Sequence, residues 1–201
     1  MLSITTLPLG SYQTNCYIVR KDGNRHCLVI DPGEEAVRLC AFLEKQNLTP
    51  AAILLTHGHF DHVGAVKYVA ADYDCPVYLC ANEFSLPPTF TAGPLYYTHT
   101  YGEGSTLHLA GLTVLVRHTP GHTPGSVCLQ IEDALFTGDT LFAGSCGRTD
   151  LPGGDSAAIF KSLKRLSKME DLAVYPGHGE ASTLAWEKKT NPYLQFGEET
   201  V

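Results

Sequence analysis

The segment Thr56-His57-Gly58-His59-Phe60-Asp61-His62 decides the fold of this chain. It gathers three imidazoles and one carboxylate within residues 57–62, directly after the apolar run 51–55, which predicts a short buried strand. This order places the polar side chains at a strand-to-loop corner and in the first turn of a following helix, where a rigid element can present them to a cleft. Imidazoles and carboxylates bind zinc, iron and manganese. Their density favours a metal site over surface histidines in a polar loop.

Length, composition and charge limit the classes of protein that remain. A chain of 201 residues fits one domain with a sizeable core, and 44% hydrophobic with 17% charged residues is ordinary for a soluble globular protein. A net charge of −7 leaves no basic patch, so no nucleic-acid partner is expected. No apolar run reaches the ~18 residues of a membrane span, and the N-terminal segment does not resemble a secretory signal. We therefore expect a cytoplasmic protein without a membrane partner.

The cysteines predict a reduced protein rather than a disulfide framework. Their number, seven, is odd, and none forms a C-x-x-C pair. Cys27, Cys40 and Cys128 lie inside apolar strand or helix patterns. Such patterns are typical of buried thiols in a cytosolic protein.

Hydrophobic periodicity predicts a mixed α and β fold. Strands are expected over 2–7, 15–19, 26–30, 51–55, 75–79, 106–109, 112–118, 126–131, 134–137 and 172–175, and helices over 34–46, 63–71, 156–168 and 183–189. Each half of the chain thus supplies hairpin strands and then helices, which indicates two mixed sheets face to face with helices outside. Residues 82–104, rich in proline and tyrosine, are either a plain surface loop or an active-site lid.

Three later strand-like runs also end in a residue that can bind a metal. His122 lies in the Gly- and Pro-rich turn 118–126, Asp139 follows an apolar strand ending in Thr-Gly, and His178 lies between two glycines after another strand. Each signal alone is weak, but its repetition at four strand ends favours a shared site. The seven candidate ligands are His57, His59, Asp61, His62, His122, Asp139 and His178. A tetrahedral zinc takes four ligands, so seven suit two metals that share a carboxylate and lie roughly 3.5–4 Å apart.

Eight stretches of the chain resemble those of a known family: Thr14–Tyr17, Ile30–Gly33, Thr56–His62, His118–Ser126, Thr137–Phe142, Cys146–Asp150, Pro176–Gly179 and Asn191–Leu194. Their order and spacing identify the chain as a member of the metallo-β-lactamase superfamily. Within it, the chain most resembles short, single-domain glyoxalase II-like (hydroxyacylglutathione hydrolase-like) proteins, over nearly its whole length.

The resemblance implies an αββα sandwich with two metal ions in a cleft at one edge of the sheets. The two ligand sets that it assigns to separate ions are His57, His59 and His122 and, for the second ion, Asp61, His62 and His178. Asp139 would bridge the ions together with a water or hydroxide.

The resemblance also implies a hydrolase. Two divalent cations would lower the pKa of the shared water, and the resulting metal-bound hydroxide would attack a small thioester such as S-lactoylglutathione. We expect zinc, although the same ligands accept iron or manganese. Asp61 is a candidate to orient the nucleophile and Asp139 to bridge the ions, which makes both candidate catalytic residues.

Other reactions remain open alternatives. A persulfide dioxygenase-like enzyme shares the sandwich and a segment like 147–150, and it would use one iron held at His57, His122 and Asp139. Hydrolases of the superfamily that act on lactones, other esters or phosphodiesters are further alternatives, as is a metal-binding module without turnover.

Three residues are candidates for supporting roles around the metals or the substrate. Asp31 is expected either to accept a hydrogen bond from a ligand histidine or to cap its own Asp-Pro-Gly turn. His118 is either a partner of the metal site or a structural residue. Arg148 is expected either to meet a substrate carboxylate or to pair with an acid of the fold.

The chain departs from long glyoxalase II enzymes near its C-terminal end. Only a short segment follows His178, so we expect residues 1–201 to form one domain without the C-terminal helical substrate domain of those enzymes. Where they have Glu and Tyr after the last ligand histidine, this chain has Gly179-Glu180-Ala181. The resemblance therefore extends to the metal ligands and stops short of the glutathione site.

Overall fold

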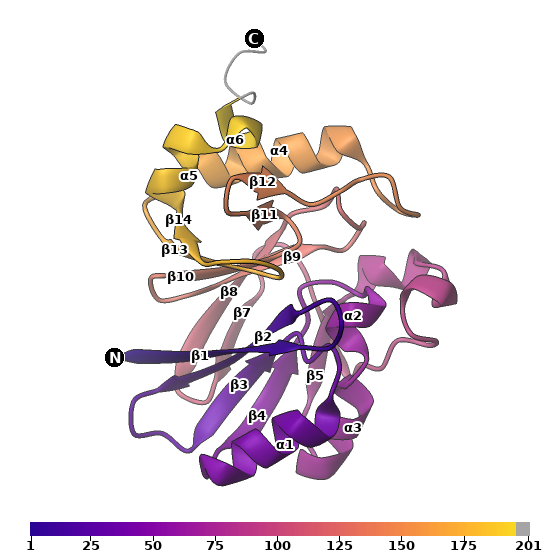
Figure 1. Ribbon diagram of the computed structural model, residues 1–201, viewed down its shortest axis with the longest axis vertical. Coiled ribbons are helices and arrows are strands. Elements are labelled where there is room, and N and C mark those ends of the chain that lie inside the picture. Colours follow the sequence, from indigo (N-terminus) through magenta and orange to yellow (C-terminus); the bar gives the residue numbers. More distant parts are fainter. Residues whose placement is uncertain (196–201) are drawn as a thin grey trace.

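The first half of the chain forms one of two six-stranded sheets that face each other in the computed structural model, which describes residues 1–195 (Figure 1). Its strands lie in chain order, antiparallel from β1 to β3 and parallel from β3 to β6. They are β1 (Leu2–Leu9), β2 (Thr14–Lys21), β3 (His26–Ile30), β4 (Thr49–Leu54), β5 (Val77–Cys80) and β6 (His99–Tyr101). The β1–β2 hairpin pairs Leu2 with Lys21 and Leu9 with Thr14.

The second sheet has the strand order β14-β13-β10-β9-β8-β7. Its strands are β7 (Thr106–Leu109), β8 (Leu112–His118), β9 (Val127–Ile131), β10 (Ala134–Gly138), β13 (Ala173–Pro176) and β14 (Ser182–Thr183). Only β10 and β13 are parallel neighbours, so this sheet is also mixed. A separate hairpin of β11 (Leu141–Phe142) and β12 (Ser145–Cys146) follows β10.

Helices cover the outer face of each sheet (Figure 1). The first sheet carries α1 (Ala36–Lys45) and α3 (Val66–Tyr73), and the second carries α4 (Ser156–Ser167), α5 (Leu184–Thr190) and α6 (Pro192–Gln195). The short helices α2 (Phe60–Val63), η1 (Ala81–Ser85) and η2 (Pro88–Phe90) complete the set for residues 1–195. Within those residues, no helix has the length and apolar character needed to cross a membrane.

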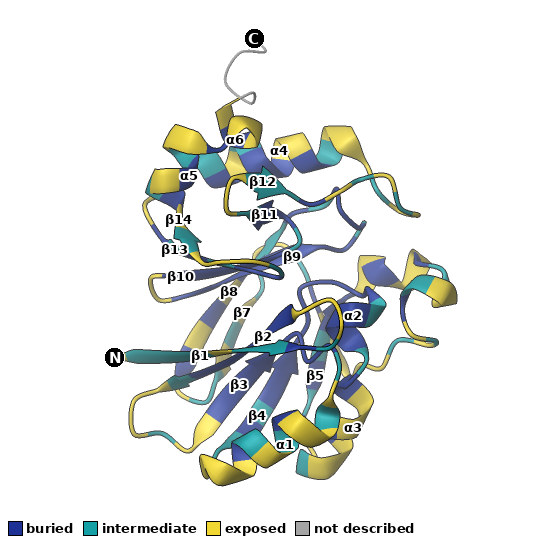
Figure 2. Ribbon diagram, viewed as in Figure 1, coloured by how far each residue is buried: buried dark blue, intermediate teal, exposed yellow. Residues whose placement is uncertain are grey.

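Side-chain alternation along the strands divides the core into three apolar layers. Buried residues are concentrated in the strands of both sheets, whereas the outer helices carry many exposed residues (Figure 2). In β3, Val29 packs toward α1 and α3, whereas Leu28 packs toward the second sheet. In β10, Leu135 packs toward α4, whereas Phe136 packs toward the first sheet. Because successive side chains of a strand point to opposite faces, strands that are apolar on both faces require this αββα arrangement. The predicted pair of mixed sheets with outer helices is therefore confirmed.

The helix predicted over 63–71 is wrong in its boundaries. The structure has α2 and α3 on either side of a break at residues 64–65. At this break the Ala65 N–H donates to the Pro32 carbonyl, 3.1 Å away, instead of continuing the α2 ladder. A Cβ on Gly64 would lie 2.5 Å from the Gly33 carbonyl oxygen, so the chain passes very close to the 32–33 turn. This tertiary contact has no periodic signal in the sequence.

Segment 82–104 is more ordered than a plain loop. It contains most of η1, all of η2 and the edge strand β6, which pairs in parallel with β5. The β11–β12 hairpin was likewise not predicted, because two-residue strands are too short for a pattern. The cysteine prediction agrees with the structure: all seven are free, and five of them are buried.

Replacing Phe136 by alanine should test the contact between the two sheets. Phe136 is fully buried, stacks on Tyr175 with ring centroids 5.2 Å apart, and meets Tyr17 edge-on at 5.1 Å. We expect Phe136→Ala to lower the free energy of unfolding by about 3–5 kcal/mol, measured by urea denaturation. Val37→Ala, at a position 86% exposed on α1, is the control and should change it by less than ~0.5 kcal/mol. Equal effects of the two changes would contradict the layered core.

Candidate metal centre

The carboxyl ends of five strands bring the seven predicted ligands and Asp31 to one edge of the sandwich. Strands β3 and β4 are parallel in the first sheet, and β8, β10 and β13 run in one direction in the second. Each of these five strands is followed by a loop or turn that supplies a polar side chain. The residues supplied are Asp31 after β3; His57, His59, Asp61 and His62 after β4; His122 after β8; Asp139 after β10; and His178 after β13.

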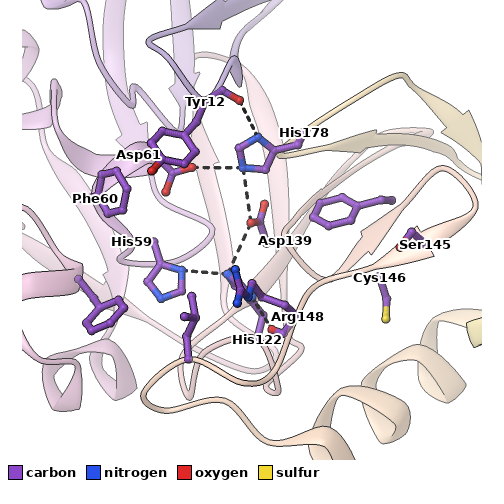
Figure 3. A pocket seen from close by; sticks show the side chains of 13 residues that line it. Tyr12, His59, Phe60, Asp61, His122, Asp139, Ser145, Cys146, Arg148 and His178 are labelled. Atoms are coloured by element: carbon purple, nitrogen blue, oxygen red, sulfur yellow. Dashed lines mark hydrogen bonds and ion pairs between the residues drawn. The ribbon is translucent and has the colours of Figure 1, made fainter.

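One group of potential ligands consists of His57, His59 and His122. One ring nitrogen from each lies within 4.8 Å of the others. His59 Nδ1 is 2.9 Å from His122 Nε2 (Figure 3). The Nε2 atoms of His57 and His59 are buried and have no hydrogen-bond partner. Buried polar atoms without a partner are costly and uncommon, so these lone pairs fit a cation.

A second group consists of Asp61, His62 and His178, with ligand atoms again within 4.8 Å of one another. Asp61 Oδ2 lies 3.2 Å from His178 Nε2 and 3.7 Å from His62 Nε2. The two imidazole Nε2 atoms are 3.4 Å apart. An oxygen and two nitrogens at these separations form a donor set suited to a divalent transition metal.

Asp139 lies between the two groups and contacts both (Figure 3). Its Oδ1 is 3.3 Å from His62 Nε2, and its Oδ2 is 3.5 Å from His122 Nε2 and 3.6 Å from His178 Nε2. Asp139 Oδ1 is also buried without a hydrogen-bond partner. The residues present therefore fit two cations, one at each group, with Asp139 within reach of both.

The charges of the site follow from burial and from its mixture of acids and imidazoles. Burial and the neighbouring imidazoles lower the pKa of His57, and burial and His122 lower that of His59 to about 4. Both shifts favour the neutral ring, which is the form that binds a metal. Burial opposes the charged form of His62, but Asp139 and Asp31 outweigh burial and raise its pKa. Burial likewise opposes ionisation of Asp139, yet His62 and His122 lower the pKa of this carboxyl.

The contacts of the Asp31 carboxylate agree with the first of its two expected functions, a bond to a ligand histidine, and reach Thr56 rather than its own Asp-Pro-Gly turn. Its Oδ2 lies 2.9 Å from His62 Nδ1, and it accepts hydrogen bonds from the Thr56 N–H at 2.7 Å and the Thr56 hydroxyl at 2.6 Å. Asp31 is buried and has a positive φ of 51°, a conformation that is strained for a non-glycine residue. The carboxylate thus orients the ring of a predicted ligand and ties the ends of β3 and β4 together.

Segment 14–17 holds the turn that carries His178. The Asn15 side-chain amide donates to the carbonyls of Pro176 at 3.0 Å and Gly179 at 2.9 Å, and the Tyr17 hydroxyl donates to Pro176 at 2.6 Å. A Cβ on Gly177 would lie 2.2 Å from Asp139 Oδ1, so only glycine allows this turn to pass so near the site. Sequence reasoning did not predict these contacts. The Thr-Asn-Cys-Tyr stretch at 14–17 entered only as part of the family resemblance, without a function of its own.

The contacts of His118 and Arg148 bear on the two alternatives that the sequence left open for each residue. The His118 ring bonds to the Pro124 carbonyl at 2.8 Å and not to a predicted ligand, so only its structural alternative agrees with the contacts. The Arg148 guanidinium forms two 2.7 Å contacts with Asp150, an acid of the fold. Its backbone carbonyl lies 2.8 Å from His122 Nδ1 and fixes that ring. Because every residue has a backbone carbonyl, the sequence gives no indication of an acceptor of this kind.

A cavity of about 580 Å³ opens onto the ligand cluster. Its polar side is formed by Ser145, Cys146 and Arg148 and by five of the predicted ligands, which are His59, Asp61, His122, Asp139 and His178 (Figure 3). Its apolar side chains come from five segments and are Tyr12, Phe60, Phe90, Phe142 and Leu151. Phe90 belongs to η2, so segment 82–104 contributes to the cavity wall. A largely apolar cleft with a few convergent polar groups is typical of a site for a small molecule.

A family model described as the metallo-beta-lactamase superfamily matches residues 9–178 of the chain. The probable metallo-hydrolase YqgX of Bacillus subtilis is 37% identical, over 94% of this chain and 95% of that protein. The hydroxyacylglutathione hydrolase GloC of Haemophilus influenzae is 34% identical, over 96% of this chain and 98% of that protein.

Solved structures show the same similarity. The BLEG-1 B3 metallo-beta-lactamase superimposes with a TM-score of 0.88 at 38% identity, covering 96% of this chain and 99% of that one. TTHA1623 in a di-iron-bound form gives a TM-score of 0.83 at 40% identity, with 94% and 99% covered. ETHE1 from Myxococcus xanthus gives 0.84 at 26% identity, with 98% and 90% covered.

Removing the carboxylate between the two groups should lower metal content. We expect Asp139→Ala to bind fewer than two ions per chain and to lose activity, because each group loses a shared oxygen; elemental analysis of purified protein measures this. His26→Ala and His108→Ala are controls, since both histidines are exposed and lie away from the ligand-bearing strand ends. Asp139→Ala protein with wild-type metal content and rate would contradict a shared carboxylate.

Proposed function

The chain belongs to the metallo-beta-lactamase superfamily, and on that premise we propose that it is a dinuclear metal-dependent hydrolase of small thioesters such as S-lactoylglutathione. The observation that carries the proposal is the position of Asp139, whose two oxygens lie 3.3–3.6 Å from imidazoles of both ligand groups. A carboxylate shared between two donor sets is characteristic of two-metal hydrolases.

The ligand sets of the proposal are the two groups described above, with Asp139 common to both. We propose zinc as the metal, with iron or manganese as alternatives, because imidazole and carboxylate ligands accept all three. The di-iron-bound form of TTHA1623 supports iron as one of these alternatives. When bound, two cations supply Lewis acidity for a substrate carbonyl and lower the pKa of a water molecule.

The chain's own residues orient the reacting groups. Asp61 lines the cavity, accepts a 3.0 Å hydrogen bond from the Thr14 hydroxyl, and has its pKa lowered by His178 and His62 against the effect of burial. An ionised carboxylate in this position can accept a hydrogen bond from a water molecule and so orient it. Asp31 and the Arg148 carbonyl fix the rings of His62 and His122. Such partners preserve the geometry on which transition-state stabilisation depends.

The cavity and one relative support a thioester substrate. A volume of about 580 Å³ suits a small molecule. The apolar wall can contact an acyl group or thiol carrier and exclude water from the carbonyl. A thiolate is a good leaving group, so the reaction needs little protonation by the protein. The similarity to the hydroxyacylglutathione hydrolase of Haemophilus influenzae favours a hydroxyacyl thioester of glutathione over lactones and other esters.

Metal analysis combined with two assays tests the proposed function. We expect two ions per chain and release of thiol from S-lactoylglutathione. Chelation should lower this rate by roughly 100-fold or more, because metal ions contribute several kcal/mol to the barrier, and metal addition should restore it. Fully loaded protein that releases no thiol from any acyl thioester would rule out the proposal. One iron per chain, with oxygen uptake on glutathione persulfide, would instead identify a dioxygenase.

A further inference from the structure

Glu83 is a fully buried carboxylate that the proposed chemistry does not use. It lies in η1, outside the strand ends that supply the ligands, and is 0% exposed. Its Oε2 accepts a hydrogen bond from the Gly58 N–H at 2.5 Å, and its Oε1 accepts one from the Gly125 N–H at 2.6 Å. One side chain therefore connects two backbone amides that belong to separate loops.

These two loops carry all three histidines of one ligand group. Gly58 lies between His57 and His59, and Gly125 closes the turn that presents His122. His59 and His122 are 63 residues apart in sequence, yet their ring nitrogens approach to 2.9 Å. Glu83 comes from a third segment, 25 residues after Gly58 and 42 before Gly125, so it bridges the loops from outside.

Both contacts depend on close approach of the backbone. A Cβ at residue 125 would lie 2.7 Å from Glu83 Cγ, and one at residue 58 would lie 3.0 Å from Glu83 Oε2. Burial raises the pKa of Glu83, whereas the hydrogen bonds from Thr123 and from the two glycine amides lower it. These donors thus stabilise the carboxylate in the interior. The carboxylate in turn holds the two loops at a fixed distance from each other.

We propose that Glu83 is a positioning residue that fixes the two loops relative to each other and so aligns His57, His59 and His122 for one metal ion. The inference rests on the proposed dinuclear centre for the identity of that ion. It assigns no direct contact of Glu83 with Asp61, His62 or His178, because the two backbone amides that it holds are those of Gly58, between His57 and His59, and Gly125, in the turn of His122.

Glu83→Gln is the variant that tests this assignment. Glutamine keeps the shape of the side chain, but its amide group turns an N–H donor toward one of the two glycine N–H groups. Glu187→Gln is the matched control: Glu187 is also 0% exposed and accepts the Gly144 N–H at 2.8 Å, but it contacts neither loop. The two variants should lower the melting temperature of metal-free protein by similar amounts.

Metal affinity should separate the two variants. In full-length protein titrated with zinc against a chromophoric chelator, Glu83→Gln should weaken one of two binding steps by roughly 10–100-fold, as partners of ligand groups do. His122→Ala and His178→Ala identify the steps: the weakened step should be the one that His122→Ala removes. Glu187→Gln should keep both affinities. Wild-type affinity in Glu83→Gln, or equal weakening of both steps, would overturn the inference.

Hydrogen exchange of metal-free wild-type protein supplies a test that requires neither metal nor a folded variant. The Gly58 and Gly125 amide protons should be protected as strongly as those of the central strands, and exchange as fast as loop amides at either glycine would overturn the inference. Failure of thioester hydrolysis would count against the proposed function alone, because neither the exchange nor the zinc titration involves substrate.

Discussion

Seven imidazole and carboxylate groups share one small, largely buried volume, and they can stay there only if cations or charged neighbours compensate them. The Nε2 atoms of His57 and His59 have no hydrogen-bond partner, and neither does Oδ1 of Asp139. Such atoms would normally be solvated or hydrogen-bonded. The surrounding protein therefore has to hold the ligands in place against their own tendency to move apart. Asp31, the Arg148 carbonyl and segment 14–17 all serve this purpose.

The sandwich provides the rigidity that this constraint requires. Strands such as β3 and β10 are apolar on both faces, so each is fixed between a helix layer and the opposite sheet. The carboxyl ends of these strands therefore have little conformational freedom, and this fixes the positions of the polar residues that follow them. The same edge of both sheets is used, which is why the centre lies between them. Short segments on this rigid frame, such as η2 and the β11–β12 hairpin, supply the apolar wall of the cavity.

Sequence reasoning identified the two mixed sheets and the clustered ligands because both depend on local patterns. Alternating strands have a period of two residues, and a strand ending in Gly-Asp or Gly-His can be read directly. The structure adds what comes from distant contacts. The break between α2 and α3 depends on the 32–33 turn, and Arg148 acts through a carbonyl that every residue possesses. Glu83 resembles a surface acid in a polar segment, since its partners lie 25 and 42 residues away.

The bonds from Asn15 to the 176–179 turn have a consequence for biosynthesis. They join residues 161 and 164 positions apart, so the turn that carries His178 can be fixed only after nearly the whole described chain has emerged from the ribosome. Contacts between such distant residues form late in folding. Nascent chains would present the early histidines without their partners. The full donor set is therefore assembled only when the 176–179 turn joins the first hairpin, at the end of folding rather than during it.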